Sequence, residues 1–264
     1  MEYGMPTLLE LDLDGNVKLA LELGLSFVEI NCNVPEFQVD KMDPQTFLDY
    51  TKQSGLTFTF HLDEMMSITD PNLKISEAYI LSVLESIEFA KQAKIESLTL
   101  HLLSGVVFTL PDKKVYVYEK YRDYYLDRIR NFRDRVTQAI KDSKISINIE
   151  NVTGFLPHMR EGIECLLESP VFGLTYDCGH NHRYDNVDWD FIQKHADRIR
   201  HMHVHDCKEK FDHQSFGDGD LNIPSELNFA AQYATRAVIE VKNMESIIQT
   251  VFVLRTYQNQ NLIK

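Results

Sequence analysis

The feature that most constrains the fold of this chain is an unbroken alternation of short β-type segments with longer amphipathic segments. Runs with alternating or continuous apolar side chains are each followed by a segment with helical periodicity. The expected strands are residues 5–9, 26–30, 57–61, 97–101, 145–150, 172–176, 199–204 and 237–241. The expected helices are residues 16–23, 44–54, 75–91, a segment within 118–141, 159–167, 189–195, 225–233 and 244–255. Strands separated by helices pair in parallel, so the pattern indicates an α/β fold.

Eight strand–helix units are the number that closes a (β/α)₈ TIM barrel, and the chain length of 264 residues suits one such barrel. An open doubly wound sheet would carry a glycine-rich turn after the first strand, whereas Asp12-Leu13-Asp14-Gly15 has no such pattern. No linker or low-complexity stretch divides the chain. We therefore predict a single domain over residues 1–264.

Composition narrows the classes of partner. The formal net charge of −13 disfavours nucleic acid, although a local basic groove stays open, because such binding depends on Lys and Arg neutralising phosphates. The basic run from Arg122 to Arg135 is interleaved with aspartates and is typical of a solvated helix face.

No stretch is long and apolar enough for a membrane span, and no signal peptide is visible. Four cysteines without a CxxC pair indicate free thiols, so we expect a cytoplasmic protein.

Acidic residues and histidines stand at the ends of six consecutive expected strands. They are His61, His101, Glu150, Asp177, His203 and Glu240. Active sites of this fold lie at the carboxyl ends of the strands, so these side chains should converge. Glu150, Asp177, His203 and Glu240 supply three carboxylates and one imidazole, a donor set that suits Zn²⁺, Mn²⁺, Co²⁺ or Mg²⁺. We predict that these four residues bind a divalent metal.

The three carboxylates also have plainer interpretations. Glu150 could be an ion-paired core residue, Glu240 could pair only with Lys242, and Asp177 could cap the following helix. Strand alternation puts His201 and His205 on the same face as His203, where they could be ligands, core histidines or supports for a ligand.

Four further histidines are candidates for an additional metal or for substrate contacts: His61, His101, His180 and His213. A histidine at a strand end is also often a hydrogen-bonded structural residue. His158 and His182 are assigned to the surface or to supporting positions. The longest excursion between elements, residues 102–118, is a candidate lid or subunit contact.

Several motifs resemble those of the xylose isomerase-like TIM-barrel superfamily, which includes sugar and sugar-phosphate isomerases and epimerases and endonuclease IV. They are IEN at 149–151, DCGH at 177–180, HMHVHDC at 201–207, the H-x₃-G-x-G from 213 to 219 and VIEV at 238–241. The resemblance implies that Glu150, Asp177, His203 and Glu240 hold the shared ion. It places His61 and His101 where endonuclease IV binds an additional zinc, and His180 and His213 where it binds a third. One departure is that Phe211 replaces an aspartate of that third site, with Asp212 adjacent.

The resemblance implies a metal-dependent sugar or sugar-phosphate isomerase or epimerase, with Glu150 and Glu240 transferring a proton through a metal-stabilised enediolate. We expect Zn²⁺ or Mn²⁺ as the cofactor, with Co²⁺ or Mg²⁺ as alternatives, and no organic cofactor. The alternatives are an endonuclease IV-like zinc phosphodiesterase and a catalytically inactive barrel that only binds sugar or metal. One ion per chain would favour the isomerase, and two or three would favour the hydrolase. The identity of the sugar, its phosphorylation and the oligomeric state cannot be read from the residues.

Overall fold

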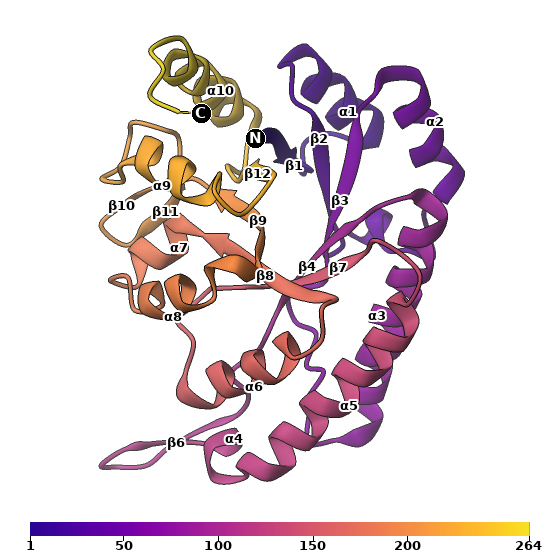
Figure 1. The fold of residues 1–264 in the computed structure, drawn as a ribbon, viewed down its shortest axis with the longest axis vertical. Coiled ribbons are helices and arrows are strands. Elements are labelled where there is room, and N and C mark those ends of the chain that lie inside the picture. Colours follow the sequence, from indigo (N-terminus) through magenta and orange to yellow (C-terminus); the bar gives the residue numbers. More distant parts are fainter. Residues whose placement is uncertain (264) are drawn as a thin grey trace.

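The computed structural model describes residues 1–263 and contains a closed barrel of eight parallel strands, in the order β1-β12-β9-β8-β7-β4-β3-β2 (Figure 1). The barrel strands are β1 (Glu2–Pro6), β2 (Phe27–Asn31), β3 (Thr57–His61), β4 (Ser97–His101), β7 (Ser146–Glu150), β8 (Phe172–Asp177), β9 (Ile199–Val204) and β12 (Arg236–Ile239). Every neighbouring pair that the closure requires is parallel, including β1 with β2. The predicted (β/α)₈ barrel is confirmed.

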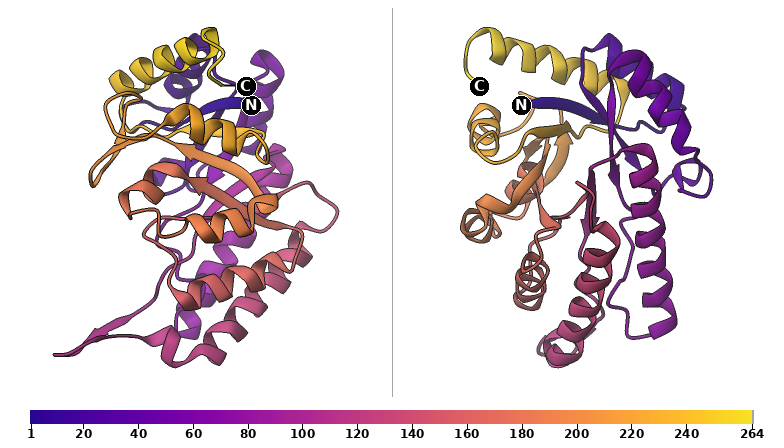
Figure 2. Two further views of the ribbon diagram at one scale, coloured as in Figure 1. Left: turned by 60° about the vertical axis from the view of Figure 1, so that its left-hand side comes forward. Right: turned by 45° about the vertical axis from the view of Figure 1, so that its right-hand side comes forward.

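Helices cover the outside of the barrel (Figures 1 and 2). The longer ones are α1 (Leu13–Glu22), α2 (Pro44–Ser54), α3 (Leu73–Ala93), α5 (Arg122–Ile140), α6 (Pro157–Leu167), α9 (Ile223–Ala230) and α10 (Met244–Asn259). Shorter helical segments are η1 (Pro35–Phe37), α4 (Val117–Lys120), α7 (Cys178–Arg183), α8 (Trp189–Lys194) and η2 (Ala196–Arg198). Among residues 1–263, none of the helices has both the length and the apolar character that crossing a bilayer requires.

Local sequence explains where α2 begins and ends. The side chain of Asp43 accepts a hydrogen bond from the backbone N–H of Gln45, and Pro44 occupies the first turn, where its missing N–H costs nothing. Gly55 ends the helix in the left-handed conformation with a φ of 78°, which glycine adopts without strain. Residues 44–54 were predicted as a helix that Gly55 closes, with the bounds that the structure shows.

The first and the last of the predicted strands have different bounds in the structure. The first strand is Glu2–Pro6, not residues 5–9, because its ladder with β12 starts at Glu2, while Leu9 is 83% exposed in the following loop. Strand β12 ends at Ile239, so Glu240 follows it directly. The backbone N–H of Glu240 still donates to the Val204 carbonyl at 3.0 Å and continues the ladder.

Two antiparallel hairpins were not predicted. One pairs β10 (Asp206–Lys208) with β11 (Phe211–Gln214) after β9, and the other pairs β5 (Val107–Thr109) with β6 (Lys114–Tyr116). The β5–β6 hairpin projects well beyond the helices (Figure 2, left). It occupies the middle of the excursion 102–118, whose role as a lid or subunit contact stays a prediction.

Candidate metal centre

The four residues predicted as metal ligands come together at the carboxyl end of the barrel. Glu150 is the last residue of β7, Asp177 the last of β8, His203 the penultimate residue of β9, and Glu240 follows β12. One potential ligand atom of each lies within 4.8 Å of those of the other three, and all four side chains are buried. Their convergence agrees with the predicted site, and their role as ligands stays a prediction.

His203 lies at the centre of this group. Its Nδ1 is 3.1 Å from Glu150 Oε1, 3.3 Å from Glu240 Oε2 and 3.9 Å from Asp177 Oδ2. Glu240 Oε2 is buried and makes no hydrogen bond. Three carboxylates and an imidazole nitrogen thus face a common centre, with an orphaned buried oxygen among them. Buried charges of like sign are costly unless a cation compensates them, so the chemistry of this donor set fits a divalent ion.

Histidines and a lysine hold Glu150 and Glu240 ionised. Burial alone would raise the pKa of Glu150, but the positive charges of His203 and His101 lower that pKa well below its usual value. The pKa of Glu240 is likewise raised by burial and lowered more strongly by Lys242 and His203, and Lys242 Nζ lies 2.7 Å from Glu240 Oε1. The Glu240–Lys242 pair considered from the sequence therefore exists, and it leaves the second oxygen of Glu240 free for the cluster.

His61 and His101 both approach the other oxygen of Glu150. Their Nε2 atoms lie 3.2 Å and 3.0 Å from Glu150 Oε2. The Nδ1 of His61 lies 2.9 Å from the Leu62 carbonyl oxygen, to which only a protonated nitrogen can donate. In a neutral His61 ring, Nε2 would then direct a lone pair toward the carboxylate, the arrangement of a metal-ligating histidine. Without a cation, the His61 ring must be protonated so that Nε2 can donate to Glu150. Burial lowers the pKa of His61, but the nearby Glu150 carboxylate raises it, and the net shift of the pKa is upward.

The other two candidate histidines differ in whether they reach the central group. His180 Nδ1 is 3.4 Å from Asp177 Oδ2 and 3.5 Å from Glu150 Oε1. His213 does not reach the central group; its Nδ1 donates to the backbone carbonyl of Glu240 at 3.0 Å. Burial lowers the pKa of His213 to about 4, whereas Asp177 and Glu150 outweigh burial and raise the pKa of His180 to about 10.

Asp212, beside the departure at Phe211, contacts Arg183 closely, and its Oδ2 lies 3.7 Å from His180 Nε2. A carboxylate engaged by a guanidinium has less negative charge to offer an ion. His180, His205 and His213 nevertheless gather as a group of nitrogens.

Asp177 fulfils both roles considered from the sequence. Its Oδ1 accepts a hydrogen bond from the His180 backbone N–H at 2.6 Å and so caps α7, while Oδ2 faces the cluster. His205 supports it, with Nε2 3.1 Å from Oδ1. The nearest partner of His205 Nδ1 is the backbone N–H of His213, at 2.8 Å, so the ring proton resides on Nε2 and points at Asp177.

The sequence interpretation missed Glu29, which is 1% exposed in the middle of β2. Its two oxygens lie 2.9 Å from His203 Nε2 and 3.0 Å from His201 Nε2. An acidic residue in an otherwise apolar strand was the available signal, because a buried carboxylate requires partners.

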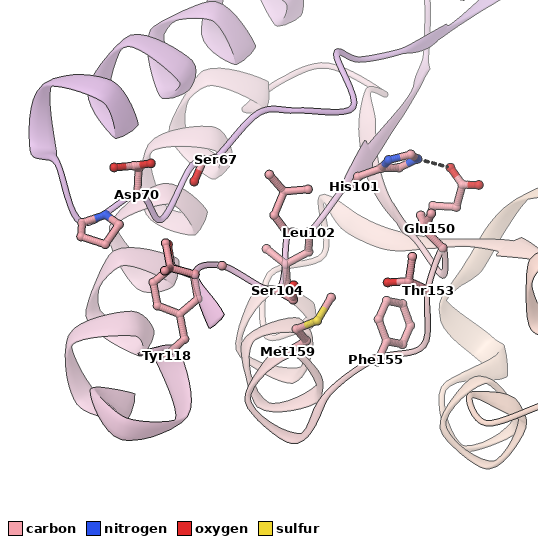
Figure 3. A pocket seen from close by; sticks show the side chains of 15 residues that line it. Ser67, Asp70, His101, Leu102, Ser104, Tyr118, Glu150, Thr153, Phe155 and Met159 are labelled. Carbon is pink, nitrogen blue, oxygen red and sulfur yellow. Dashed lines mark hydrogen bonds and ion pairs between the residues drawn. The ribbon is translucent and has the colours of Figure 1, made fainter. Parts of the chain in front are cut away.

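A pocket of about 390 Å³ opens beside the cluster and reaches Glu150 and His101 (Figure 3). Its wall combines apolar side chains such as Met159 and Phe155 with hydroxyls, and Asp70 lies at its far end. The hydroxyl of Tyr118 donates to the Thr69 carbonyl at 2.8 Å and so joins α4 to the segment before α3. No lysine or arginine lines this pocket within the part of the chain that the structure describes.

Comparison with known proteins identifies the family. The model of the xylose isomerase-like TIM barrel family matches residues 17–256. The chain belongs to this family. A relative from Methanocaldococcus jannaschii, an uncharacterized protein, is 27% identical over 232 residues, covering 84% of this chain and 85% of the relative.

Solved structures of similar fold include a D-tagatose 3-epimerase-like protein, at 19% identity and a TM-score of 0.81, with 98% of this chain and 97% of that chain covered. The D-allulose 3-epimerase of a Methylomonas species, solved with D-allulose, is 14% identical with a TM-score of 0.73, covering 98% and 96%. The IolI protein, solved with a bound zinc atom, is 13% identical with a TM-score of 0.70, covering 99% and 97%. At these identities the likeness shows the fold.

Proposed function

We propose that this protein is a metal-dependent sugar isomerase or epimerase that moves a carbon-bound proton between Glu150 and Glu240. The convergence of Glu150, Asp177, His203 and Glu240 around one centre carries the proposal. A divalent ion bound there, Zn²⁺ or Mn²⁺, would stabilise negative charge on the carbonyl and hydroxyl oxygens of a substrate. The epimerases of the same fold act on ketoses named in their descriptions, which supports the assignment.

Glu150 and Glu240 are suited to exchange a proton with the substrate. Both have lowered pKa values and are therefore ionised near neutral pH, as a general base must be before it accepts a proton. They approach His203 Nδ1 from different strands, so a substrate held between them would present opposite faces to the two carboxylates. Lys242 beside Glu240 would stabilise that carboxylate again after the proton leaves.

The pocket favours an unphosphorylated sugar. A phosphate dianion in it would meet the carboxylates of Glu150 and Asp70 without the Arg or Lys that normally recognises phosphate. Hydroxyl groups of Ser67, Ser104 and Thr153 line the same wall and can exchange hydrogen bonds with sugar hydroxyls. We also propose a cytoplasmic location, which the four buried, unpaired cysteines support.

A specific observation favours the alternative, a zinc phosphodiesterase of the endonuclease IV kind. His61 and His101 place two nitrogens on the second oxygen of Glu150, an arrangement that could hold another ion. The engagement of Asp212 by Arg183 argues against a third ion. The net charge of −13 also disfavours a nucleic-acid substrate.

Two measurements test the proposal. The first is exchange of carbon-bound hydrogen with deuterium from D₂O, followed by NMR across a panel of ketoses and their phosphates in the presence of Zn²⁺ or Mn²⁺. We expect exchange with an unphosphorylated ketose, and exchange slower by about 10²- to 10⁴-fold in the Glu240→Gln variant. The second is the metal content of the purified protein together with cleavage of an abasic-site oligonucleotide. Cleavage with two or more zinc ions per chain, and no exchange with any ketose, would refute the isomerase assignment.

A further inference from the structure

Glu29 lies one tier below the candidate metal centre, inside the barrel. It is the central residue of β2, pairs in register with Thr59 of β3, and is 1% exposed. None of the reactions considered above uses it. A carboxylate this deep in a barrel core carries a large desolvation cost, so its contacts require an explanation.

The two oxygens of Glu29 have separate partners. Oε2 accepts a hydrogen bond from the Thr59 hydroxyl at 3.0 Å and lies 3.0 Å from His201 Nε2. Oε1 lies 2.9 Å from His203 Nε2. Thr59 and His201 thus fix the carboxylate by one oxygen and turn the other toward His203.

His203 consequently contacts a carboxylate at both ring nitrogens. Its Nε2 lies 2.9 Å from Glu29 Oε1, within ion-pair distance but not aligned as a hydrogen bond, and its Nδ1 lies near Glu150, Glu240 and Asp177. A neutral imidazole carries one proton, and only the unprotonated nitrogen can bind a metal. When a cation occupies the cluster, a carboxylate beside Nε2 favours the tautomer that carries the proton there, which leaves the lone pair of Nδ1 for the ion.

We propose that Glu29 is a positioning residue for the metal centre, which sets the ring orientation and tautomer of His203, and that Thr59 and His201 hold Glu29 in place. The inference depends on the proposed metal site but not on the reaction that the site serves. The competing explanation is that Glu29 only forms a buried ion pair that stabilises the barrel. That explanation predicts a change in melting temperature without a change in metal affinity.

The test compares four variants of the full-length protein. Glu29→Gln keeps the size of the side chain but replaces one acceptor oxygen with an NH₂ donor. Thr59→Val removes one hydrogen bond to Glu29. The matched control is Thr99→Val, because the Thr99 hydroxyl is also fully buried in the barrel and makes one 3.0 Å hydrogen bond, to Thr175. His203→Gln removes the nitrogen ligand.

The measurements are Zn²⁺ and Mn²⁺ affinity by competition with a chromophoric chelator, far-UV circular dichroism of the metal-free protein, and ¹⁵N chemical shifts of the His203 ring. We expect Glu29→Gln to weaken metal binding by about 10- to 100-fold and to shift the proton of His203 away from Nε2. Thr59→Val should weaken binding by a smaller factor, and Thr99→Val should bind as the wild type does.

Wild-type affinity in Glu29→Gln, with binding lost in His203→Gln, would overturn the proposal and leave the metal site standing. If the wild type binds neither ion, the metal site itself is refuted and the inference falls with it. If Glu29→Gln does not fold, the two threonine variants decide: weaker binding in Thr59→Val than in Thr99→Val supports the proposal, and equal binding overturns it.

Discussion

Replacing Gly179 with alanine should damage the metal centre through His205. Gly179 lies in α7, and a Cβ built on it would stand 2.0 Å from Cε1 and 2.2 Å from Nδ1 of the His205 ring. The ring cannot retreat without loss, because its Nε2 contacts Asp177 at 3.1 Å and its Nδ1 accepts from the His213 backbone at 2.8 Å. The added methyl group must therefore displace a side chain that orients one of the predicted ligands.

Two opposing terms set the effect on stability. Alanine is favoured over glycine inside a helix by about 1 kcal/mol, whereas overpacking a tight interior costs about 1 to 3 kcal/mol. The net destabilisation should be about 0 to 2 kcal/mol, small enough for the variant to fold. Loss of the His205–Asp177 hydrogen bond should weaken metal binding by about 10- to 100-fold, since partners of metal-ligating side chains contribute that much.

Gly162→Ala provides the matched control. Gly162 is also helical, and its added Cβ would stand 2.5 Å from the hydroxyl oxygen of Tyr125, away from the cluster. Chelator competition should show weaker Zn²⁺ binding in Gly179→Ala only, while thermal melts show a comparable loss of stability in both variants. Equal metal affinities in the two variants would refute the reasoning.

Three further predictions follow from the same structure. Glu150→Gln and Glu240→Gln should each lower kcat by about 10²- to 10⁴-fold in the ketose exchange assay, with unchanged circular dichroism, because each removes one acid–base group. Stripping the metal with a chelator should lower the melting temperature, and restoring the ion at 100 times its Kd should recover about 2.7 kcal/mol. Burial lowers the pKa of His158 below its unfolded value of 6.5. Its neutral form therefore contributes stability above pH 6.5 that is lost as the pH falls, and the unfolding free energy of the wild type should decline more steeply from pH 6.5 to 5 than that of His158→Gln.

The barrel could be predicted from hydrophobic periodicity, because each strand is a short segment whose apolar pattern is visible in the local sequence. The segments 57–61, 97–101 and 199–204 were predicted with the bounds they have in the structure. The first strand was misplaced because Leu8 and Leu9 are apolar, yet pairing with β12 selects Glu2–Pro6. The β5–β6 hairpin was missed because its turn, Leu110-Pro111-Asp112-Lys113, lacks the Asn-Gly or Asp-Gly pair that marks a tight hairpin.

Convergence of the predicted ligands could be foreseen, because parallel strands present their carboxyl ends on one face of a barrel. Individual contacts could not. Glu29 and His201 are 172 residues apart in the chain, and only the closure of the barrel brings them within 3.0 Å. The engagement of Asp212 by Arg183 likewise depends on how the β10–β11 hairpin folds over α7.

A regularity in the strands would have revealed the residues beneath the site. Side chains two positions apart share a face of a strand, so the residue two before each strand-end group points to the same interior. Apart from Val238 before Glu240, these pairs are Glu29 before Asn31, Thr59 before His61, Thr99 before His101, Asn148 before Glu150, Thr175 before Asp177 and His201 before His203. All six preceding residues are buried and polar, whereas barrel interiors are usually filled by Val, Ile and Leu. Burying polar groups costs stability unless they are hydrogen-bonded, and the bonds Thr59–Glu29, Glu29–His201 and Thr99–Thr175 join neighbours within this tier. The tier therefore exchanges apolar packing for hydrogen bonds, and within it Glu29 is the residue that contacts the predicted ligand His203 directly.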